Sequence, residues 1–251
     1  MAWRWFLLLS VILLLFVVDD AMATEIKVLS AGAVEPGMVK VIDAFRRETG
    51  HDVNVTFATA PAIRKRIDGG EAADVVIAPP DVLEGVVKVG KAAAAEQVAV
   101  GRIGIGITVR NDAPLPKIAT VDEFKRSLLH AESVVYNQAS TGIYLERLFD
   151  RLGIAQELKA KTTRYPDATA VLTHIAKGSG SEIGLAAVTV VIEGENMGLK
   201  LVGPLPAEIQ NYTMYTATTV PGKTVSDTAR QFVRYISTPA AKAVFAAAGI
   251  E

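Results

Sequence analysis

The first third of the chain alternates between strand-like and helix-like patterns of apolar residues. Short runs that are continuously apolar, or that alternate with polar residues, cover 25–31, 52–57 and 74–77. From Met38 to Phe45 the apolar residues instead recur at the i, i+3, i+4, i+7 spacing of one helix face, and Gly50 is suited to end that helix. Residues 60–69 form a second helical segment, with Pro61 in its first turn. This order predicts a parallel sheet with helices on its faces.

The remaining two thirds continue this alternation after a long apolar run. Residues 98–109 are longer than an ordinary strand and are interrupted by Gly101, Gly104 and Gly106, so they could form one strand that passes between two lobes. Further strands are predicted at 133–136, 183–187 and 212–219. Further helices are predicted after the N-cap candidates Thr120, Asp167 and Ser226, after the turn 139–142, and from Pro239 onward.

Residues 1–23 have the pattern of a cleavable export signal. Arg4 precedes an apolar stretch over 5–18, and Ala21-Met22-Ala23 supplies the small-x-small pattern that signal peptidase needs. A membrane anchor fits less well, because this stretch has 14 residues and a spanning helix needs about 20. We therefore expect a mature protein of residues 24–251. Since the chain has no cysteine for a lipid anchor, we expect that protein to be free in a compartment such as the bacterial periplasm.

Charge and motifs narrow the classes of function. Loss of Arg4, Asp19 and Asp20 with the signal brings the formal net charge from −1 to zero, and without a basic run the chain is a poor match to nucleic-acid binding. The three histidines lie far apart and no HExxH pattern occurs, so no metal site is expected. Without a G-x-S-x-G elbow, a Walker A motif or a nucleophile–base set, we expect no catalytic residues and no cofactor.

Four of the predicted strand-to-helix turns consist mainly of small residues. They are 30–33, 58–61, 139–142 and 167–168. Helix N-termini expose unpaired N–H groups and the positive end of the helix dipole, so several that converge can hold an oxyanion without a full counter-charge. Small side chains would let that anion approach the backbone. The same turns could also be ordinary connections, which favour Gly, Ala, Ser and Thr in any case.

At these turns the sequence resembles a known family. The stretches that carry the resemblance are IKVLSAGAVEPGMVKVIDAFRRETGHDVNVTFA, GGEAADVVIAPP, STGIYLERLFDRLGI and STPAAKAVFAAAGI. They resemble the periplasmic molybdate-binding proteins and, more widely, the type II solute-binding proteins of ABC transporters. The resemblance implies an α/β fold of two lobes, each a mostly parallel sheet flanked by helices, with a ligand cleft between them. It implies lobe I at 24–103 plus 208–251, lobe II at 104–207, and hinge crossings near 101–106 and 204–212.

The resemblance also implies a ligand site with altered side chains. Molybdate binders use serine hydroxyls at the first two turns and a tyrosine on a later strand, where this chain has Ala33, Ala60 and Ala187. Their backbone donors align with Thr141 and Ala168. The full set of expected ligand-binding residues is Gly32, Ala33, Thr59, Ala60, Pro61, Ser140, Thr141, Gly142, Asp167, Ala168 and Ala187. Hydrogen bonds to a charged partner contribute about 1.5–3 kcal/mol each, so three lost donors should weaken a tetrahedral oxyanion site.

Two explanations of these differences stay open. Thr59, Ser140 and Thr141 could supply replacement hydroxyls, which would leave a molybdate or tungstate binder. Alternatively, the three alanines widen the pocket for a larger ligand. Arg64 and Arg164 are then candidates to grip a carboxylate in a bidentate fork, although an arginine taken singly is more often a solvated surface residue. We favour a small anion other than molybdate, such as an organic carboxylate.

The function that the resemblance implies is carriage of a solute outside the cytoplasm. The protein would be a monomer that binds a small anion and delivers it to an ABC permease in the inner membrane. A sensory binding protein of the same fold is one alternative. An exported enzyme is another, and the missing nucleophile–base set argues against it.

Overall fold

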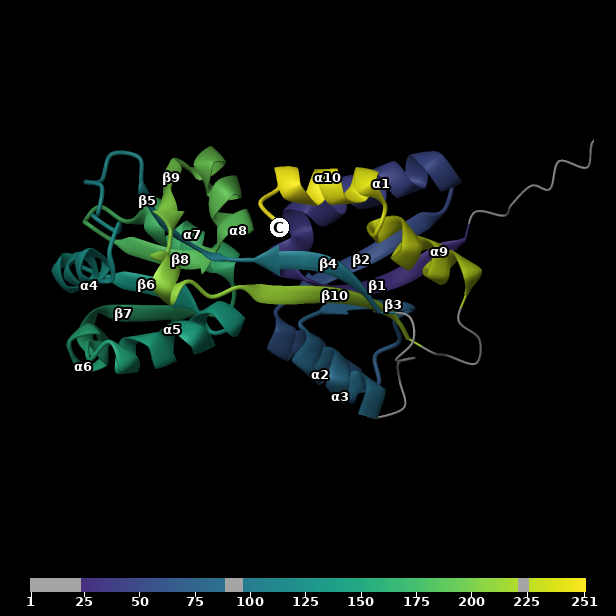
Figure 1. The fold of residues 1–251 in the computed structure, drawn as a ribbon, viewed down its shortest axis with the longest axis horizontal. Coiled ribbons are helices and arrows are strands. Elements are labelled where there is room, and N and C mark those ends of the chain that lie inside the picture. The colour runs from purple at the N-terminus through teal and green to yellow at the C-terminus, as the bar shows by residue number, and fades with distance from the viewer. Residues whose placement is uncertain (1–23, 89–96, 221–225) are drawn as a thin grey trace, which may run out of the picture.

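Two five-stranded sheets organise the protein in the computed structural model, which describes residues 24–88, 97–220 and 226–251 (Figure 1). The predicted export signal lies outside these residues. The first sheet has the strand order β2-β1-β3-β10-β4 and the second has the order β7-β6-β8-β5-β9. The strands of the first sheet are β1 (Glu25–Ala31), β2 (Asp52–Ala58), β3 (Val75–Ala78), β4 (Gln97–Ile103) and β10 (Thr213–Thr219). Those of the second are β5 (Ile105–Arg110), β6 (Val134–Asn137), β7 (Thr162–Tyr165), β8 (Ile183–Ala187) and β9 (Leu199–Pro204).

Each sheet contains one reversed strand. In the first sheet β2, β1 and β3 pair in parallel, whereas β10 pairs antiparallel with both β3 and β4. In the second sheet β7, β6 and β8 pair in parallel, whereas β5 pairs antiparallel with both β8 and β9. Four of the five described strands in each sheet therefore run the same way, and the prediction of mostly parallel sheets is confirmed. The turns that follow these parallel strands lie at the carboxyl edges of the sheets.

The long apolar run at 98–109 crosses from one sheet to the other. It is two strands rather than one, because β4 ends at Ile103 and β5 begins at Ile105 in the second sheet. The chain returns between β9 and β10, and Gln210 in this return segment forms hydrogen bonds to the first crossing. Its Oε1 accepts the N–H of Ile105 at 2.9 Å and its Nε2 donates to the carbonyl of Ile105 at 3.0 Å. The two crossings are thus hydrogen-bonded to each other.

Helices cover both faces of the sheets (Figure 1). Around the first sheet they are α1 (Glu35–Thr49), α2 (Ala60–Asp68), α3 (Pro80–Lys88), α9 (Asp227–Ile236) and α10 (Pro239–Ala247). Around the second they are α4 (Val121–His130), α5 (Ser140–Arg151), α6 (Ala155–Leu158), α7 (Ala168–Lys177) and α8 (Val188–Glu193). The predicted N-caps are confirmed, because the side chains of Thr120, Asp167 and Ser226 each accept a backbone N–H from three residues further on. None of the described helices has the length and apolarity to cross a membrane.

Several elements in and around the second sheet escaped prediction, among them two strands and a helix. β7 reads TTRY and β9 reads LKLVGP, and both are edge strands with few fully buried residues, so neither shows a clear apolar pattern. α8 reads VTVVIE, which is rich in the β-branched residues that favour strands. It is helical because tertiary packing buries Thr189, Val190 and Val191.

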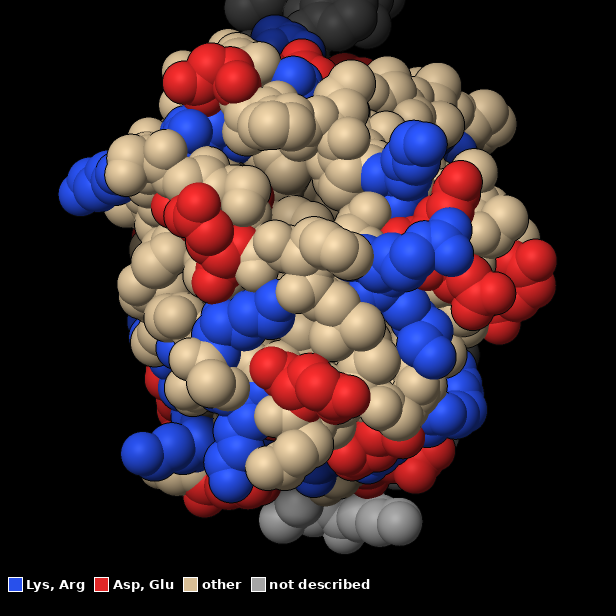
Figure 2. Space-filling model, turned by 90° about the vertical axis from the view of Figure 1, so that its left-hand side faces the viewer, with Lys and Arg blue, Asp and Glu red and all other residues tan. Residues whose placement is uncertain are grey.

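Two apolar clusters hold these layers together. One packs Phe45, Phe232 and Phe245 against the first sheet and continues through α7 and α8 onto one face of the second sheet. The other packs Phe124 and Phe149 on the opposite face of the second sheet. Figure 2 shows the end of the molecule formed by the second sheet and its helices, where basic and acidic side chains are intermixed over the surface in view.

Candidate functional site

A cavity of about 410 Å³ lies between the two sheets, lined by turns from both. Nine of the eleven predicted ligand-binding residues lie around it: Gly32, Ala33, Thr59, Ala60, Ser140, Thr141, Asp167, Ala168 and Ala187. They come from the turns after β1, β2, β6, β7 and β8. The structure therefore brings together segments that are far apart in the sequence, and the part that each residue plays in binding remains a prediction.

Two predicted residues in the first turns of their helices do not line the cavity. Pro61 is exposed at the second position of α2. Gly142 is buried in the first turn of α5, where an added Cβ would lie 1.6 Å from the carbonyl oxygen of Asn137. Gly142 is therefore needed for the close approach of α5 to β6, which is a reason of packing rather than of ligand contact.

Both candidate arginines lie away from the cavity, which corrects the expectation that they would grip a ligand there. Arg64 is one helical turn beyond the start of α2 and points toward α3, where its guanidinium donates to the carbonyl of Asp81. Arg164 on β7 pairs with Glu146 and lies 5.7 Å from the ring centroid of Tyr136, in a separate hollow. Helix and strand periodicity thus point both side chains at neighbouring elements.

The helix N-termini at the cavity differ in how they are capped. The described helices α4, α7, α9 and α10 each have a side chain that accepts a first-turn N–H. In α2 and α5 the N-cap residue itself makes no such hydrogen bond, although Thr59 at the N-cap of α2 carries a hydroxyl. Because the first N–H groups of a helix have no partner within it, those of α2 and those of Ser140 and Thr141 in α5 are available at the cavity, whereas that of Gly142 is bonded to a side chain. An anion could accept them.

Asn137 is a cavity residue that the sequence reasoning missed. It ends β6, only 4% of its surface is exposed, and it lines the cavity. Its Oδ1 accepts the backbone N–H of Ala139 at 2.9 Å and that of Gly142 at 3.4 Å. The signal that could have found it is a polar residue at the end of an apolar strand, directly before a turn of small residues.

Acidic side chains also face the cavity. Glu35 at the start of α1 and Glu193 at the end of α8 line it, together with Asp167. Burial, with the Glu193 carboxylate second, raises the pKa of Glu35 above its ordinary value. No Lys, Arg or His occurs among the described residues of this lining. Its donors are therefore neutral groups, and its charged groups are carboxylates.

Tyr215 on β10 is a further lining residue, and it is largely buried. Burial raises the pKa of its phenol, so the hydroxyl keeps its proton at neutral pH. Among the residues that the structure describes, no three or more histidine, cysteine or acidic side chains are grouped so that they could hold a metal ion.

Comparison with known proteins identifies a family for the chain and one relative with a named activity. The family model described as "Bacterial extracellular solute-binding protein" matches residues 26–251. An aconitate isomerase from Pseudomonas sp. is 31% identical over 228 residues, which cover 88% of this chain and 86% of that protein.

Two solved structures with the same fold are anion-binding proteins by name. The periplasmic molybdate-binding protein of Azotobacter vinelandii has a TM-score of 0.75 at 18% identity, with 90% of this chain and 98% of that chain covered. The sulfate-binding protein SubI of Mycobacterium tuberculosis H37Rv has a TM-score of 0.71 at 20% identity, with 90% of this chain and 86% of that chain covered.

Proposed function

This chain belongs to the family of bacterial extracellular solute-binding proteins, with the two-lobed fold of the periplasmic molybdate-binding proteins, and from that premise we propose that it binds a small organic carboxylate. The observation that carries the proposal is that α2 and α5 begin at a cavity between the two sheets and keep first-turn N–H groups that no N-cap side chain accepts. Backbone N–H groups at helix N-termini are suited to a carboxylate as well as to an inorganic oxyanion.

The remaining lining favours a carboxylate over molybdate or sulfate. Ala33, Ala60 and Ala187 line the cavity without a hydroxyl. Glu35 and Glu193 place negative charge at the same cavity, and this charge repels a compact dianion, whose two charges lie together, more than one carboxylate group of an extended ligand whose other groups lie further away. The cavity volume of about 410 Å³ also lies within the range of sites for small organic molecules.

We further propose that the protein acts in the periplasm and delivers its ligand to an ABC permease. The family match supports a location outside the cytoplasm. Closure would bring lobe I, at 24–103 plus 208–251, onto lobe II, at 104–207, about crossings near 101–106 and 204–212. Genes for a permease and an ATPase beside this gene would support delivery, whereas a receptor gene there would support a sensory protein.

Isothermal calorimetry on residues 24–251 tests the ligand class. The panel contains citrate, trans-aconitate, succinate, sulfate, tungstate and molybdate. We expect a carboxylate to bind at least about 100-fold more tightly than any inorganic anion, since the hydroxyls that would hold a tetrahedral ion are absent at three positions. Sub-micromolar binding of molybdate with no binding of a carboxylate would contradict the proposal.

A second candidate function is isomerisation of an unsaturated carboxylate. The Pseudomonas relative named aconitate isomerase favours it, and so does the carboxylate pair of Glu35 and Glu193 at the cavity. Moving a double bond without a cofactor requires a group that removes one proton and returns another. A carboxyl group whose pKa is raised by burial and by a neighbouring carboxylate is suited to this task.

A turnover assay separates the two functions. The protein is incubated with cis-aconitate or trans-aconitate and the products are resolved by proton NMR. If the chain is an isomerase, turnover should be abolished in Glu35→Gln and retained in Glu195→Gln, because Glu195 is exposed and outside the cavity lining. Tight binding of either compound with no conversion would leave the carrier function and exclude this isomerisation.

A further inference from the structure

Asn137 presents a buried amide group whose orientation is fixed by the backbone around it. Its Oδ1 accepts N–H groups from Ala139 and from Gly142. A flipped amide would point its own N–H hydrogens at these two donors, so the observed orientation is the one that the turn permits. Nδ2 must therefore point away from the backbone of the turn.

Nδ2 of Asn137 has no hydrogen-bond partner among the described residues, yet it is not sealed inside the protein. Among the described residues, Ser133 Oγ is the side-chain oxygen or nitrogen that is both shut off from solvent and without a hydrogen-bond partner. Nδ2 of Asn137 also has no partner among these residues, so it must keep some contact with solvent. The residue is 4% exposed and lines the cavity, so the access of Nδ2 is toward the cavity. A buried donor in this situation needs an acceptor, and the cavity is where it can find one.

The first turn of α5 provides further donors beside this amide. Asn137 occupies the N–H groups of Ala139 and Gly142, which leaves those of Ser140 and Thr141 available at the helix N-terminus. The hydroxyls of Ser140 and Thr141 also make no side-chain hydrogen bond among the described residues. One side-chain amide and one helix start therefore present neutral donors to the same part of the cavity.

We propose that Asn137 is a specificity-determining residue of this site, whose Nδ2 donates to a carboxylate group of the ligand held at the N-terminus of α5. This inference rests on the proposed binding function and adds a side-chain amide donor to the hydroxyls of Ser140 and Thr141. An amide is neutral, so it can bind a carboxylate beside the Glu35 and Glu193 carboxylates without forming an ion pair with them. Asn137 thus supplies a donor from the second sheet to a cavity that has no hydroxyl at Ala33 and Ala60 of the first sheet.

Asn137→Asp tests this proposal without removing the support of the turn. Aspartate keeps an oxygen that can accept from Ala139 and Gly142, but it replaces the donor Nδ2 with a negatively charged acceptor. The control is Gln138→Glu, which adds the same charge one residue further on, at an exposed position outside the cavity lining. Both variants are made in residues 24–251, and their unfolding midpoints are compared with that of the parent by circular dichroism.

We expect a large loss of ligand affinity in Asn137→Asp and almost none in the control variant. With the panel carboxylate that the parent binds most tightly as the probe, Asn137→Asp should bind at least about 100-fold more weakly, because one charge-assisted hydrogen bond is lost and a repulsive charge is added. Gln138→Glu should stay within about threefold of the parent. Binding by Asn137→Asp within threefold of the parent would overturn the role of Asn137 and leave the proposed function intact.

The ligand class and the role of Asn137 can fail separately. If the parent binds molybdate, tungstate or sulfate but no carboxylate, the proposed ligand class fails, and the same two variants are compared with that anion as the probe. If Asn137→Asp does not fold, the side-chain amide signal of Asn137 is followed by NMR in the labelled parent. Slower exchange of its hydrogens on ligand addition supports the contact, and an unchanged signal at saturation overturns it.

Discussion

Glu35 lies at the cavity in which we propose that an anion binds. It begins α1, lines the cavity and faces Glu193, and burial together with that neighbour raises its pKa. An ionised Glu35 repels an anion and a protonated Glu35 does not. Anion binding should therefore be favoured by the protonated form and should weaken as the pH rises through the raised pKa.

We expect Glu35→Gln to remove this dependence of anion binding on pH. At neutral pH the variant should bind the ligand about two- to fivefold more tightly than the parent, the range expected for one partly solvated charge. Below the raised pKa of Glu35 the two proteins should bind equally. Calorimetry at a series of pH values measures the difference, and Glu195→Gln is the control. Equal affinities at neutral pH would mean that Glu35 does not act on the ligand.

Asp167 both caps a helix and places a charge at the cavity, and substitutions can separate these two effects. Its side chain caps α7 by accepting the N–H of Ala170 at 2.8 Å, and the residue lines the cavity. Asp167→Asn keeps a cap and removes the charge, so its stability should be close to that of the parent and its anion affinity should rise. Asp167→Ala removes both, and its free energy of unfolding should fall by about 1 kcal/mol.

Ser226→Ala provides the comparison for the loss of the cap. Ser226 caps α9 through the N–H of Ala229 at 3.0 Å and does not line the cavity. Its removal should lower stability by about the same amount, with no change in ligand affinity. Urea unfolding and calorimetry measure the two quantities. A weaker affinity in Asp167→Asn would show that the carboxylate itself contacts the ligand.

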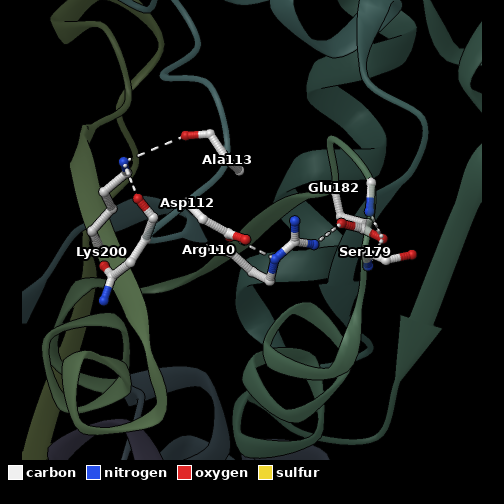
Figure 3. Close-up of polar contacts among 8 residues, drawn as sticks. Arg110, Asp112, Ala113, Ser179, Glu182 and Lys200 are labelled. Atoms are coloured by element: carbon white, nitrogen blue, oxygen red, sulfur yellow. Dashed lines mark hydrogen bonds and ion pairs between the residues drawn. The ribbon is translucent and has the colours of Figure 1, made fainter.

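At the scale of elements, one ion pair links the end of β5 to the residue directly before β8. Arg110 pairs with Glu182 at 3.0 Å, and their side chains are only 14% and 13% exposed (Figure 3). Glu182 also accepts the N–H groups of Ser179 and Gly180, each at 3.2 Å. The turn before β8 is thus organised around one carboxylate whose main counter-charge comes from a neighbouring strand.

Arg110→Ala should cost about 3 kcal/mol of the free energy of unfolding, because it leaves a largely buried carboxylate without its cation. Arg66→Ala is the control, since Arg66 and Glu71 are 40% and 43% exposed, and its loss should be within about 0.5 kcal/mol. Urea denaturation of both variants measures the difference. Similar losses in both would mean that burial does not strengthen the Arg110 pair.

The same ion pair predicts a dependence of stability on pH. Burial alone would raise the pKa of Glu182, but hydrogen bonds from backbone N–H groups and the charge of Arg110 lower it overall. The carboxylate therefore stabilises the fold above the ordinary pKa of a glutamate, and this stability is lost as the pH falls through the lowered pKa. Arg110→Ala should consequently lose less stability on acidification than the parent does.

Prediction from the sequence succeeded where the local signal and the packing agree. β1 and β8 have their predicted bounds, and Gly50 ends α1 with a φ of 73°, as a left-handed terminal residue should. It failed at α8, where β-branched residues are helical because of burial between lobes. The turns of the site were predictable from small residues after strands. The position of Asn137 before such a turn is also visible in the sequence, but the orientation of its amide is not, because that depends on how the first turn of α5 folds back onto β6.

At the scale of the whole molecule, α8 connects the two halves of the structure. It follows β8 of the second sheet, yet Oγ1 of Thr189 donates to the carbonyl of Ala33 at 2.7 Å, in the turn after β1. Thr189 is fully buried, and Ala33 lines the cavity. This hydrogen bond therefore crosses between the sheets beside the proposed ligand, and opening of the lobes would have to lengthen or break it.

Thr189→Val removes the bond while keeping the shape of the side chain. The carbonyl of Ala33 loses its donor, so stability should fall by about 1–2 kcal/mol. If the bond favours the closed arrangement, the unliganded protein should also open more, and its radius of gyration from small-angle X-ray scattering should increase. Apparent affinity should then fall by up to about tenfold, in proportion to the lost population of the closed state.

Thr173→Val shows whether the effect belongs to the connection between lobes. Oγ1 of Thr173 donates to the carbonyl of Thr169 within α7 at 2.9 Å, so its loss removes a hydroxyl bond of similar length inside one lobe. This control should leave both the scattering profile and the affinity unchanged. If Thr189→Val lowers stability but also leaves both unchanged, the hydrogen bond supports the fold without biasing closure. A larger radius of gyration that contracts fully on ligand addition would identify α8 as the element through which ligand binding and lobe closure are coupled.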